Sequence, residues 1–89
     1  MTTIQLERAF KALANRRRLN IIVHLMNKKE ATVGELVAVV HASFPTVSKH
    51  LSILTAAGVV ENERRQMEVY YRLATSLPPV PRSIQKFLK

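Results

Sequence analysis

The chain has 89 residues, which is enough for one domain and too short for two. It contains no cysteine, which excludes a disulfide framework, a thiolate zinc site and a redox thiol, and no apolar run approaches the ~18 residues that cross a bilayer. The lack of cysteine and of an apolar span leads us to expect a cytoplasmic protein with no membrane partner. Fourteen Lys and Arg residues against six acidic residues, all Glu, give a net charge of +8, whose field attracts polyanions such as nucleic acid.

Two amphipathic helices joined by a tight turn are predicted first. Apolar side chains recur at helical spacing in both segments, and charged side chains occupy the other side. Asn15 is a capping residue at the start of the second helix, and the polar run from Asn27 to Glu30 ends it. The apolar positions are Leu6, Ala9, Phe10, Leu13, Leu19, Ile22, Val23 and Met26.

A capping-box pattern opens the next helix, because the Thr32 hydroxyl can accept from the first turn while Glu35 reaches back to the Thr32 N–H. This helix is short. Ser43 followed closely by Pro45 predicts the start of a fourth helix, since a serine caps well and a proline in the first turn misses no backbone donor. Gly58 predicts its end.

The hydrophobic period changes after that glycine. A polar segment carrying Arg64 and Arg65 leads into a stretch in which two sets of side chains alternate along the sequence, a pattern typical of a half-buried strand. Two strands joined by an arginine-bearing turn fit this pattern. Prolines at 78, 79 and 81 then break the chain, and a last short helix can place Ile84, Phe87 and Leu88 on one face. The alternating rows are Val69, Tyr71 and Leu73 against Glu68, Tyr70 and Arg72.

The predicted fold is mainly α with a small β-hairpin wing, in the order α-α-α-α-β-β-α. Two short helices with a tight turn, followed directly by a hairpin, describe a winged helix-turn-helix. We expect one domain over residues 1–89, with a helical hairpin over 3–27, a helix-turn-helix over 32–58, a wing over 59–73 and a C-terminal helix over 79–89.

The fourth helix has the two faces that a recognition helix requires. Apolar residues must fix it to the domain, while small polar or basic residues reach base edges and phosphates. Val47, Leu51 and Leu54 supply the first face. The second face consists of Thr46, Ser48, Lys49, His50 and Ser52, with Phe44 and Pro45 at the N-terminal tip.

Three stretches in one order and spacing carry a family resemblance. They are Leu13-Ala14-Asn15-Arg16-Arg17-Arg18-Leu19-Asn20-Ile21-Ile22, Thr46-Val47-Ser48-Lys49-His50-Leu51-Ser52-Ile53-Leu54, and Ala57-Gly58-Val59-Val60 with Arg64-Arg65 and Val69-Tyr70-Tyr71-Arg72-Leu73. Together they resemble the opening segment, recognition helix and wing of the ArsR/SmtB family of bacterial and archaeal winged-helix repressors. The resemblance covers roughly residues 6–73.

The resemblance implies major-groove contacts from the start of the recognition helix and phosphate or minor-groove contacts from the wing tip. It also implies that His50 lies at the boundary between the recognition helix and DNA. Phe44-Pro45 stands where many members carry polar residues, so Phe44 is expected to read a thymine methyl by apolar contact. Gln66 replaces the usual wing glycine, so we expect a longer or differently shaped turn. The candidate DNA-binding residues are Ser43, Phe44, Pro45, Thr46, Ser48, Lys49, His50, Arg64, Arg65 and Arg17.

Several of these side chains also have ordinary structural roles open to them. His50 can bond a backbone carbonyl instead of DNA, and among Arg16, Arg17 and Arg18 one is expected to pack its stem or bond a carboxylate while the others reach a phosphate. We expect Tyr70 and Tyr71 to pack within the hairpin. The remaining histidines, His24 and His41, are expected to be ordinary helix residues rather than metal ligands.

The metal sites typical of the resembled family have no counterpart in this sequence. Its Cys-x-Cys site in the third helix is replaced by a run containing Val37 and Val39, and residues 82–89 offer no carboxylate or imidazole. We therefore expect no metal, no cofactor and no metal or thiol sensing. A constitutive or autoregulatory repressor, release by a protein partner, and an unrecognised small molecule remain open.

Dimerisation follows from the small footprint of one recognition helix. Two helices related by a twofold axis address half-sites about 34–36 Å apart in a pseudo-palindromic operator, and the resemblance implies the same homodimer. The apolar stripes expected at the interface are Ile4, Leu6 and Phe10 on the first helix and Ile84, Phe87 and Leu88 on the last.

The predicted function is sequence-specific binding of double-stranded DNA by a homodimeric transcriptional regulator, a repressor. Through this DNA binding we expect the protein to be nucleoid-associated. An enzyme is excluded by the lack of a Cys nucleophile, of any Asp and of a glycine-rich phosphate loop, since Gly34 and Gly58 are the only glycines. The alternative is a winged-helix module that binds another protein.

Overall fold

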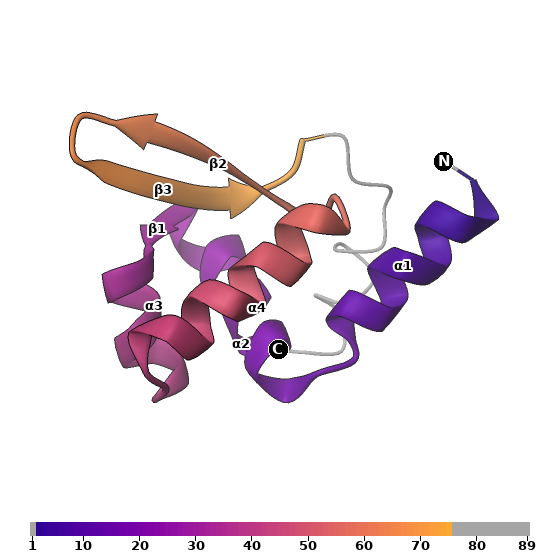
Figure 1. The fold of residues 1–89 in the computed structure, drawn as a ribbon, viewed down its shortest axis with the longest axis horizontal. Helices are drawn as coiled ribbons and strands as arrows, with labels where there is room; N and C mark the ends of the chain where they lie inside the picture. Colours follow the sequence, from indigo (N-terminus) through magenta and orange to yellow (C-terminus); the bar gives the residue numbers. More distant parts are fainter. Residues whose placement is uncertain (1, 76–89) are drawn as a thin grey trace.

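Four helices and three strands make up residues 2–75, the part of the chain that the computed structural model describes (Figure 1). The arrangement is a mainly helical winged helix-turn-helix, which confirms the predicted fold class. The predicted helix over 79–89 and its residues Ile84, Phe87 and Leu88 lie outside the described residues. The elements are α1 (Thr3–Leu13), α2 (Arg16–Lys28), β1 (Glu30–Thr32), α3 (Val33–Val40), α4 (Phe44–Ala56), β2 (Val60–Arg65) and β3 (Glu68–Leu73).

Every helix begins at a side chain that accepts a hydrogen bond from the first turn. Asn15 accepts from the Arg18 N–H, as the sequence predicts, and Thr32 forms the predicted capping box with Glu35. Such caps satisfy backbone donors that have no partner inside the helix. The remaining caps are Thr2, which forms a second capping box with Gln5, and Ser43 at the start of α4.

The helix α4 ends at the predicted glycine. Gly58 has φ +75°, in the left-handed region that lacks a steric penalty only for glycine. Its N–H donates to the Thr55 carbonyl, and the Val59 N–H reaches back to the Leu54 carbonyl, both at 3.0 Å. This turn sends the chain directly into β2.

The sheet has three antiparallel strands in the order β1-β3-β2, one more than the sequence predicts. The correction concerns Glu30, which was expected in the polar end of the second helix. Lys29, with φ +68°, ends α2, and the three residues that follow pair with β3, where Ala31 lies opposite Tyr71. A strand of three residues is too short to produce a recognisable alternation.

The hairpin turn consists of two residues, because Arg65 pairs with Glu68. Of the two alternatives expected for this turn, the longer one is therefore wrong. Gln66 adopts φ +53° and so takes the left-handed conformation that a glycine usually provides in tight hairpins. Met67 stands at the tip with 91% of its surface exposed.

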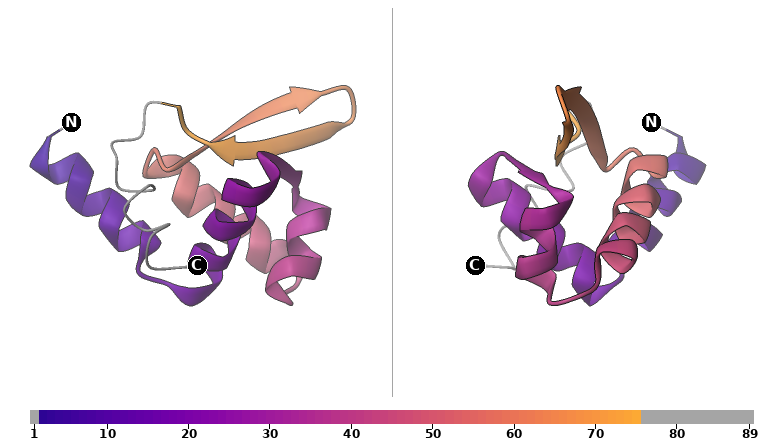
Figure 2. Two further views of the ribbon diagram at one scale, coloured as in Figure 1. Left: turned by 180° about the vertical axis from the view of Figure 1, so that it is seen from behind. Right: turned by 60° about the vertical axis from the view of Figure 1, so that its left-hand side comes forward.

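The core lies between the helices and the base of the hairpin. Side chains from all four helices, from β1 and from the start of β2 form one buried cluster. The hairpin lies over the helices and extends beyond them to one side (Figure 2). No helix among residues 2–75 combines the length and the apolar character needed to cross a membrane. The fully buried large side chains are Ile21, Ile22, Leu25, Leu36, Val47, Leu51, Leu54, Val59 and Val60.

The two glycines are expected to respond oppositely to alanine. Gly34→Ala should raise the free energy of unfolding by about 0.5 kcal/mol, because Gly34 lies within α3 and an added Cβ would meet only the Thr32 hydroxyl at 3.9 Å. Gly58→Ala should lower it by about 1 kcal/mol through backbone strain alone, since the space around that Cβ is open. Urea unfolding of both variants measures the difference, and equal shifts in one direction would contradict this account.

Candidate nucleic-acid interface

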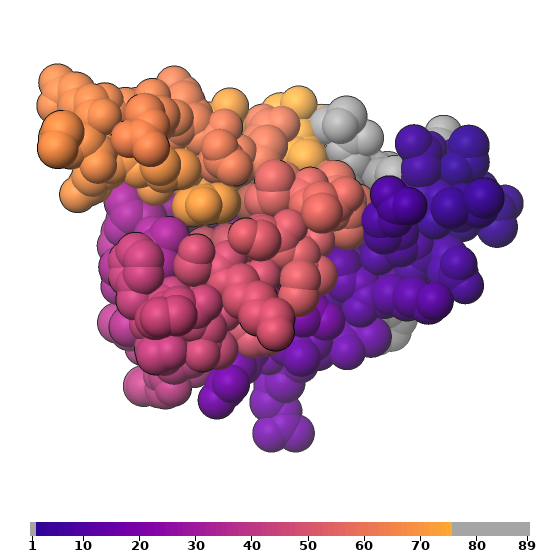
Figure 3. All heavy atoms as spheres, viewed as in Figure 1, coloured from indigo at the N-terminus to yellow at the C-terminus, as the bar shows by residue number. Residues whose placement is uncertain are grey.

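The helix α4 separates its residues into a buried face and an exposed face. Val47, Leu51 and Leu54 have no exposed surface. On the opposite side of α4, the predicted contact residues are exposed or half-buried. The helix is the magenta-to-salmon region of Figure 3. Ser43, Phe44, Pro45 and Lys49 are exposed, and Thr46, Ser48 and His50 are half-buried.

Two of the predicted contacts at the tip of α4 bond to each other. The Ser43 hydroxyl accepts from the Thr46 N–H at 3.3 Å and donates to the Thr46 hydroxyl at 2.9 Å. Ser43 therefore serves as the helix cap, while Thr46 keeps its own O–H as a donor. Phe44, the first residue of α4, has 58% of its surface exposed.

His50 is held by an arginine from α2. The Arg18 Nε–H donates to the Ala12 carbonyl at 2.5 Å, and its Nη1 lies 3.3 Å from His50 Nδ1. Because a guanidinium can only donate, Nδ1 must be the acceptor and the ring proton resides on Nε2. The sequence left a backbone carbonyl or DNA open for the histidine, and stem packing or a carboxylate for one of the arginines; in the structure, Arg18 and His50 contact each other.

The surroundings of this pair are cationic. Burial, followed by the charges of Arg18, Arg17 and Lys49, holds the pKa of His50 below its ordinary value. The imidazole is therefore neutral near pH 7 and offers a fixed Nε2–H donor. Arg17 is exposed at the start of α2 and lies close enough to His50 to affect it, so α2 and α4 together present a positive surface.

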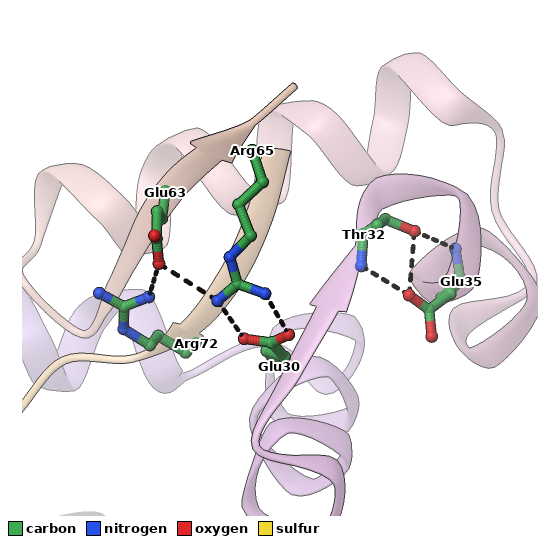
Figure 4. A network of polar contacts seen from close by, with 6 residues as sticks. All are labelled: Glu30, Thr32, Glu35, Glu63, Arg65 and Arg72. Atoms are coloured by element: carbon green, nitrogen blue, oxygen red, sulfur yellow. Dashed lines mark hydrogen bonds and ion pairs between the residues drawn. The ribbon is translucent and has the colours of Figure 1, made fainter. Parts of the chain in front are cut away.

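The outer face of the wing carries an ion-pair network (Figure 4). Arg65 donates two hydrogen bonds of 2.7 Å to the Glu30 carboxylate and one of 3.2 Å to Glu63. Arg72 links Glu63 at 2.8 Å to Glu61 at 2.9 Å. The hydrogen bonds from Arg65 hold the pKa values of Glu30 and Glu63 below their usual range.

The two adjacent wing arginines are consequently in different environments. Arg65 is occupied by carboxylates and also lies over the Tyr70 ring, 4.6 Å from its centroid. Successive side chains of a strand point to opposite faces, so Arg64 lies on the other face of the hairpin. Arg64 is exposed and forms no ion pair with any of residues 2–75.

An apolar groove runs along α1. Ile4 and Phe10 expose 69% and 51% of their surfaces, and Leu6 is half-buried between them. These are the three predicted interface residues within the described part of the chain. The groove has a volume of about 500 Å³ and is lined by Thr3, Leu6, Glu7, Phe10, Lys11 and Ala14.

The described residues contain no cluster of three or more potential metal ligands. His24 lies in α2, and its Nε2 is buried with no hydrogen-bond partner among residues 2–75. His41 ends α3 in the left-handed conformation, with φ +54°. His41 is therefore the C-terminal cap of α3.

The wing network gives a pH-dependent prediction. The folded pKa values of Glu30 and Glu63 lie below the unfolded value of ~4.3, so the network stabilises the fold above that pH and loses its effect as the pH falls through the folded values. We expect Arg65→Gln to lower the melting temperature at pH 7 and the difference from the parent to shrink below pH 4. Arg64→Gln is the matched control, and an equal loss in that variant would contradict the assignment.

Comparison with known protein families places residues 15–62 in the family described as "Bacterial regulatory protein, arsR family". The HTH-type transcriptional repressor SmtB of Mycobacterium tuberculosis is 48% identical over 64 residues, which cover 72% of this chain and 47% of the relative. The transcriptional activator HlyU of Vibrio cholerae is 36% identical over 66 residues, which cover 74% of this chain and 60% of the relative. The chain thus spans about half to three-fifths of the length of these relatives.

Two solved structures have the same fold over nearly the whole chain. HlyU from Vibrio cholerae superposes with a TM-score of 0.85 at 29% identity, covering 97% of this chain and 94% of that one. The second is described as the homodimeric winged helix-turn-helix DNA-binding domain of Mb0332 from Mycobacterium bovis. Its TM-score is 0.81 at 34% identity, and it covers 93% of this chain and 74% of that one.

Proposed function

The chain belongs to the arsR family of bacterial regulatory proteins, and from that premise we propose that it binds double-stranded DNA as a homodimer and regulates transcription as a repressor rather than acting as an enzyme. The single observation that supports this most strongly is the placement of α4, which buries Val47, Leu51 and Leu54 completely while its hydrophilic side remains accessible. The relatives include both a repressor and an activator. Repression is the simpler mode, since an operator-bound dimer needs only to obstruct a promoter.

The proposed interface combines three kinds of contact. Lys49 and Arg17 neutralise phosphates, and the Nε2–H of His50 donates to the same backbone. Phe44 packs on a thymine methyl in the major groove. Arg64 reaches a phosphate or the minor groove. Ser48 and the tip residues Ser43, Pro45 and Thr46 complete the surface in the major groove.

We assign Arg65 a smaller share of this interface than the sequence pattern suggests. Its guanidinium already has carboxylate partners on two strands, Glu30 and Glu63. A DNA contact would have to compete with these hydrogen bonds. The proposed role of Arg65 is therefore to hold the wing against β1, with Arg64 as the cation that faces DNA.

The proposed dimer uses the exposed apolar side of α1. Ile4, Leu6 and Phe10 would pack against a second copy of the chain, which would cover apolar surface that is otherwise costly to leave in water. The related Mb0332 domain is described as homodimeric. A twofold axis would then present two copies of α4 to half-sites about 34–36 Å apart.

Removing single cations should test the interface. We expect Lys49→Ala and Arg64→Ala each to weaken duplex binding by roughly tenfold at moderate salt, and each to reduce the slope of log affinity against log salt by about 0.9 per protomer. Lys28→Ala, which removes the same charge at the other end of α2 from Arg17, is the control. Fluorescence anisotropy with a selected operator measures all three, and parent-like affinity in both interface variants would refute the proposed contacts.

A protein-binding role is favoured by one observation, the exposed aromatic ring of Phe44 at the tip of α4. A hydrophobic contact with a protein groove would respond weakly to salt. DNA binding through several cations weakens steeply instead. A binding partner whose affinity is unchanged between low and high salt, in a protein that binds no duplex, would favour this alternative.

We further propose that this chain is not regulated through metal or thiol chemistry. The sequence has no cysteine, and residues 2–75 bring no three potential ligands together. Zinc or cadmium ions should therefore leave the operator affinity unchanged within twofold, and a chelator should have no effect. A metal-dependent loss of affinity in the same anisotropy titration would refute this proposal.

A further inference from the structure

A second pocket lies between α1 and α4, away from the exposed tip of the recognition helix. Its volume is about 360 Å³, within the usual range for small-molecule sites. The two helices lie side by side on the face shown in Figure 3. The pocket is lined by Arg8, Lys11, Ala12, Arg18, Ile53, Ala56 and Ala57.

The lining combines cationic with apolar side chains. Arg8, Lys11 and Arg18 contribute positive charge, and none of the lining residues is acidic. The nearest ion pair is weak, since Lys11 and Glu7 are 3.9 Å apart and both are largely exposed. An anion with an apolar body matches this combination, whereas an inorganic anion or a DNA phosphate would gain nothing from the apolar part.

Arg18 connects this pocket to the recognition helix. Its Nε and Nη1 bond to the Ala12 carbonyl and to His50, and among residues 2–75 its Nη2 has no acceptor. Nη2 is accessible to solvent, because among residues 2–75 only His24 Nε2 is a buried side-chain nitrogen or oxygen without a partner. The guanidinium therefore lines the pocket and contacts the imidazole on α4, and Nη2 is the nitrogen left free for a ligand.

We propose that the pocket binds a small organic carboxylate and that binding is transmitted to α4 through Arg18 and His50. This inference rests on the proposed function for its effect on DNA, although the binding itself does not. Carboxylates accept two parallel hydrogen bonds from a guanidinium, which makes them its preferred partners. The apolar body of the ligand would lie on Ile53 and Ala56.

The coupling follows from competition for one side chain. A carboxylate that accepts two parallel hydrogen bonds needs Nη1 or Nε besides the free Nη2. It therefore draws Arg18 toward the pocket and weakens the contact with His50, which loses the partner that fixes its tautomer. The ring proton can then move to Nδ1, and in that tautomer His50 has no Nε2–H to donate to DNA. The ligand and DNA therefore become antagonists. By thermodynamic reciprocity, DNA must weaken carboxylate binding by the same factor.

The binding step is tested with three probes of matched chemistry. Benzoate has both the charge and the apolar ring, benzamide has the ring without the charge, and acetate has the charge without the ring. We expect benzoate to shift the backbone amide signals of Ala12, Ile53 and Ala57 in a saturable NMR titration, with at least tenfold weaker binding of the other two. Equal responses to all three probes, or no shift at these positions, would overturn the proposed site.

Variants locate the site without disturbing the DNA-binding face. Ala56→Phe places a large side chain in the pocket at an exposed helix position and should abolish the benzoate shifts while leaving the melting temperature close to that of the parent. Lys11→Gln should weaken benzoate binding severalfold through loss of charge alone. Full benzoate binding in both variants would place the ligand elsewhere.

The coupling step is tested by operator binding at constant ionic strength, with chloride replacing benzoate. Saturating benzoate should weaken the affinity of the parent for DNA at least fivefold and should not affect Ala56→Phe. Benzoate binding without an effect on DNA affinity would overturn the coupling. A protein that binds no duplex even at low salt would instead refute the proposed function, and the titration with the three probes would still decide the site.

Discussion

The burial of Val47, Leu51 and Leu54 beneath α4 is the interaction on which the rest of the structure depends. Each large apolar side chain withdrawn from water contributes about 1.5–3 kcal/mol, and these three contact the cluster that α2, α3 and β2 share. They fix the rotation of α4 about its axis, so the polar residues between them must point outward. The caps at Ser43 and Gly58 then set where this face begins and ends.

Local patterns predicted most of the helical framework. The caps at Asn15, Thr32 and Ser43 were recognisable because their partners lie within three residues along the chain. The hairpin was recognisable from its alternation. What the sequence could not provide were contacts between distant residues: Arg18 meets His50 across 32 positions, and Arg65 meets Glu30 across 35. Many charged side chains compete for such pairings, and only the folded geometry selects among them.

The distribution of charge is less uniform than the net value suggests. Although the chain carries +8, four of its six carboxylates lie on or beside the wing: Glu30, Glu61, Glu63 and Glu68. Two arginines within the same sheet, Arg65 and Arg72, are largely neutralised there. Among residues 2–75, Arg64 remains without an ion pair on the wing, while Arg17 and Lys49 of α2 and α4 lie near a neutral imidazole.

The two-residue turn at Gln66 and Met67 limits how such a wing can change during evolution. Side chains alternate between the faces of a strand, so inserting a single residue into β2 would exchange the two rows beyond that point. Arg64 would then occupy the carboxylate-facing row, and Arg65 would be turned away from Glu30. Changes of length are therefore compatible with this surface only at the turn itself or in pairs of residues, and wings of odd and even lengths would require different arginine positions.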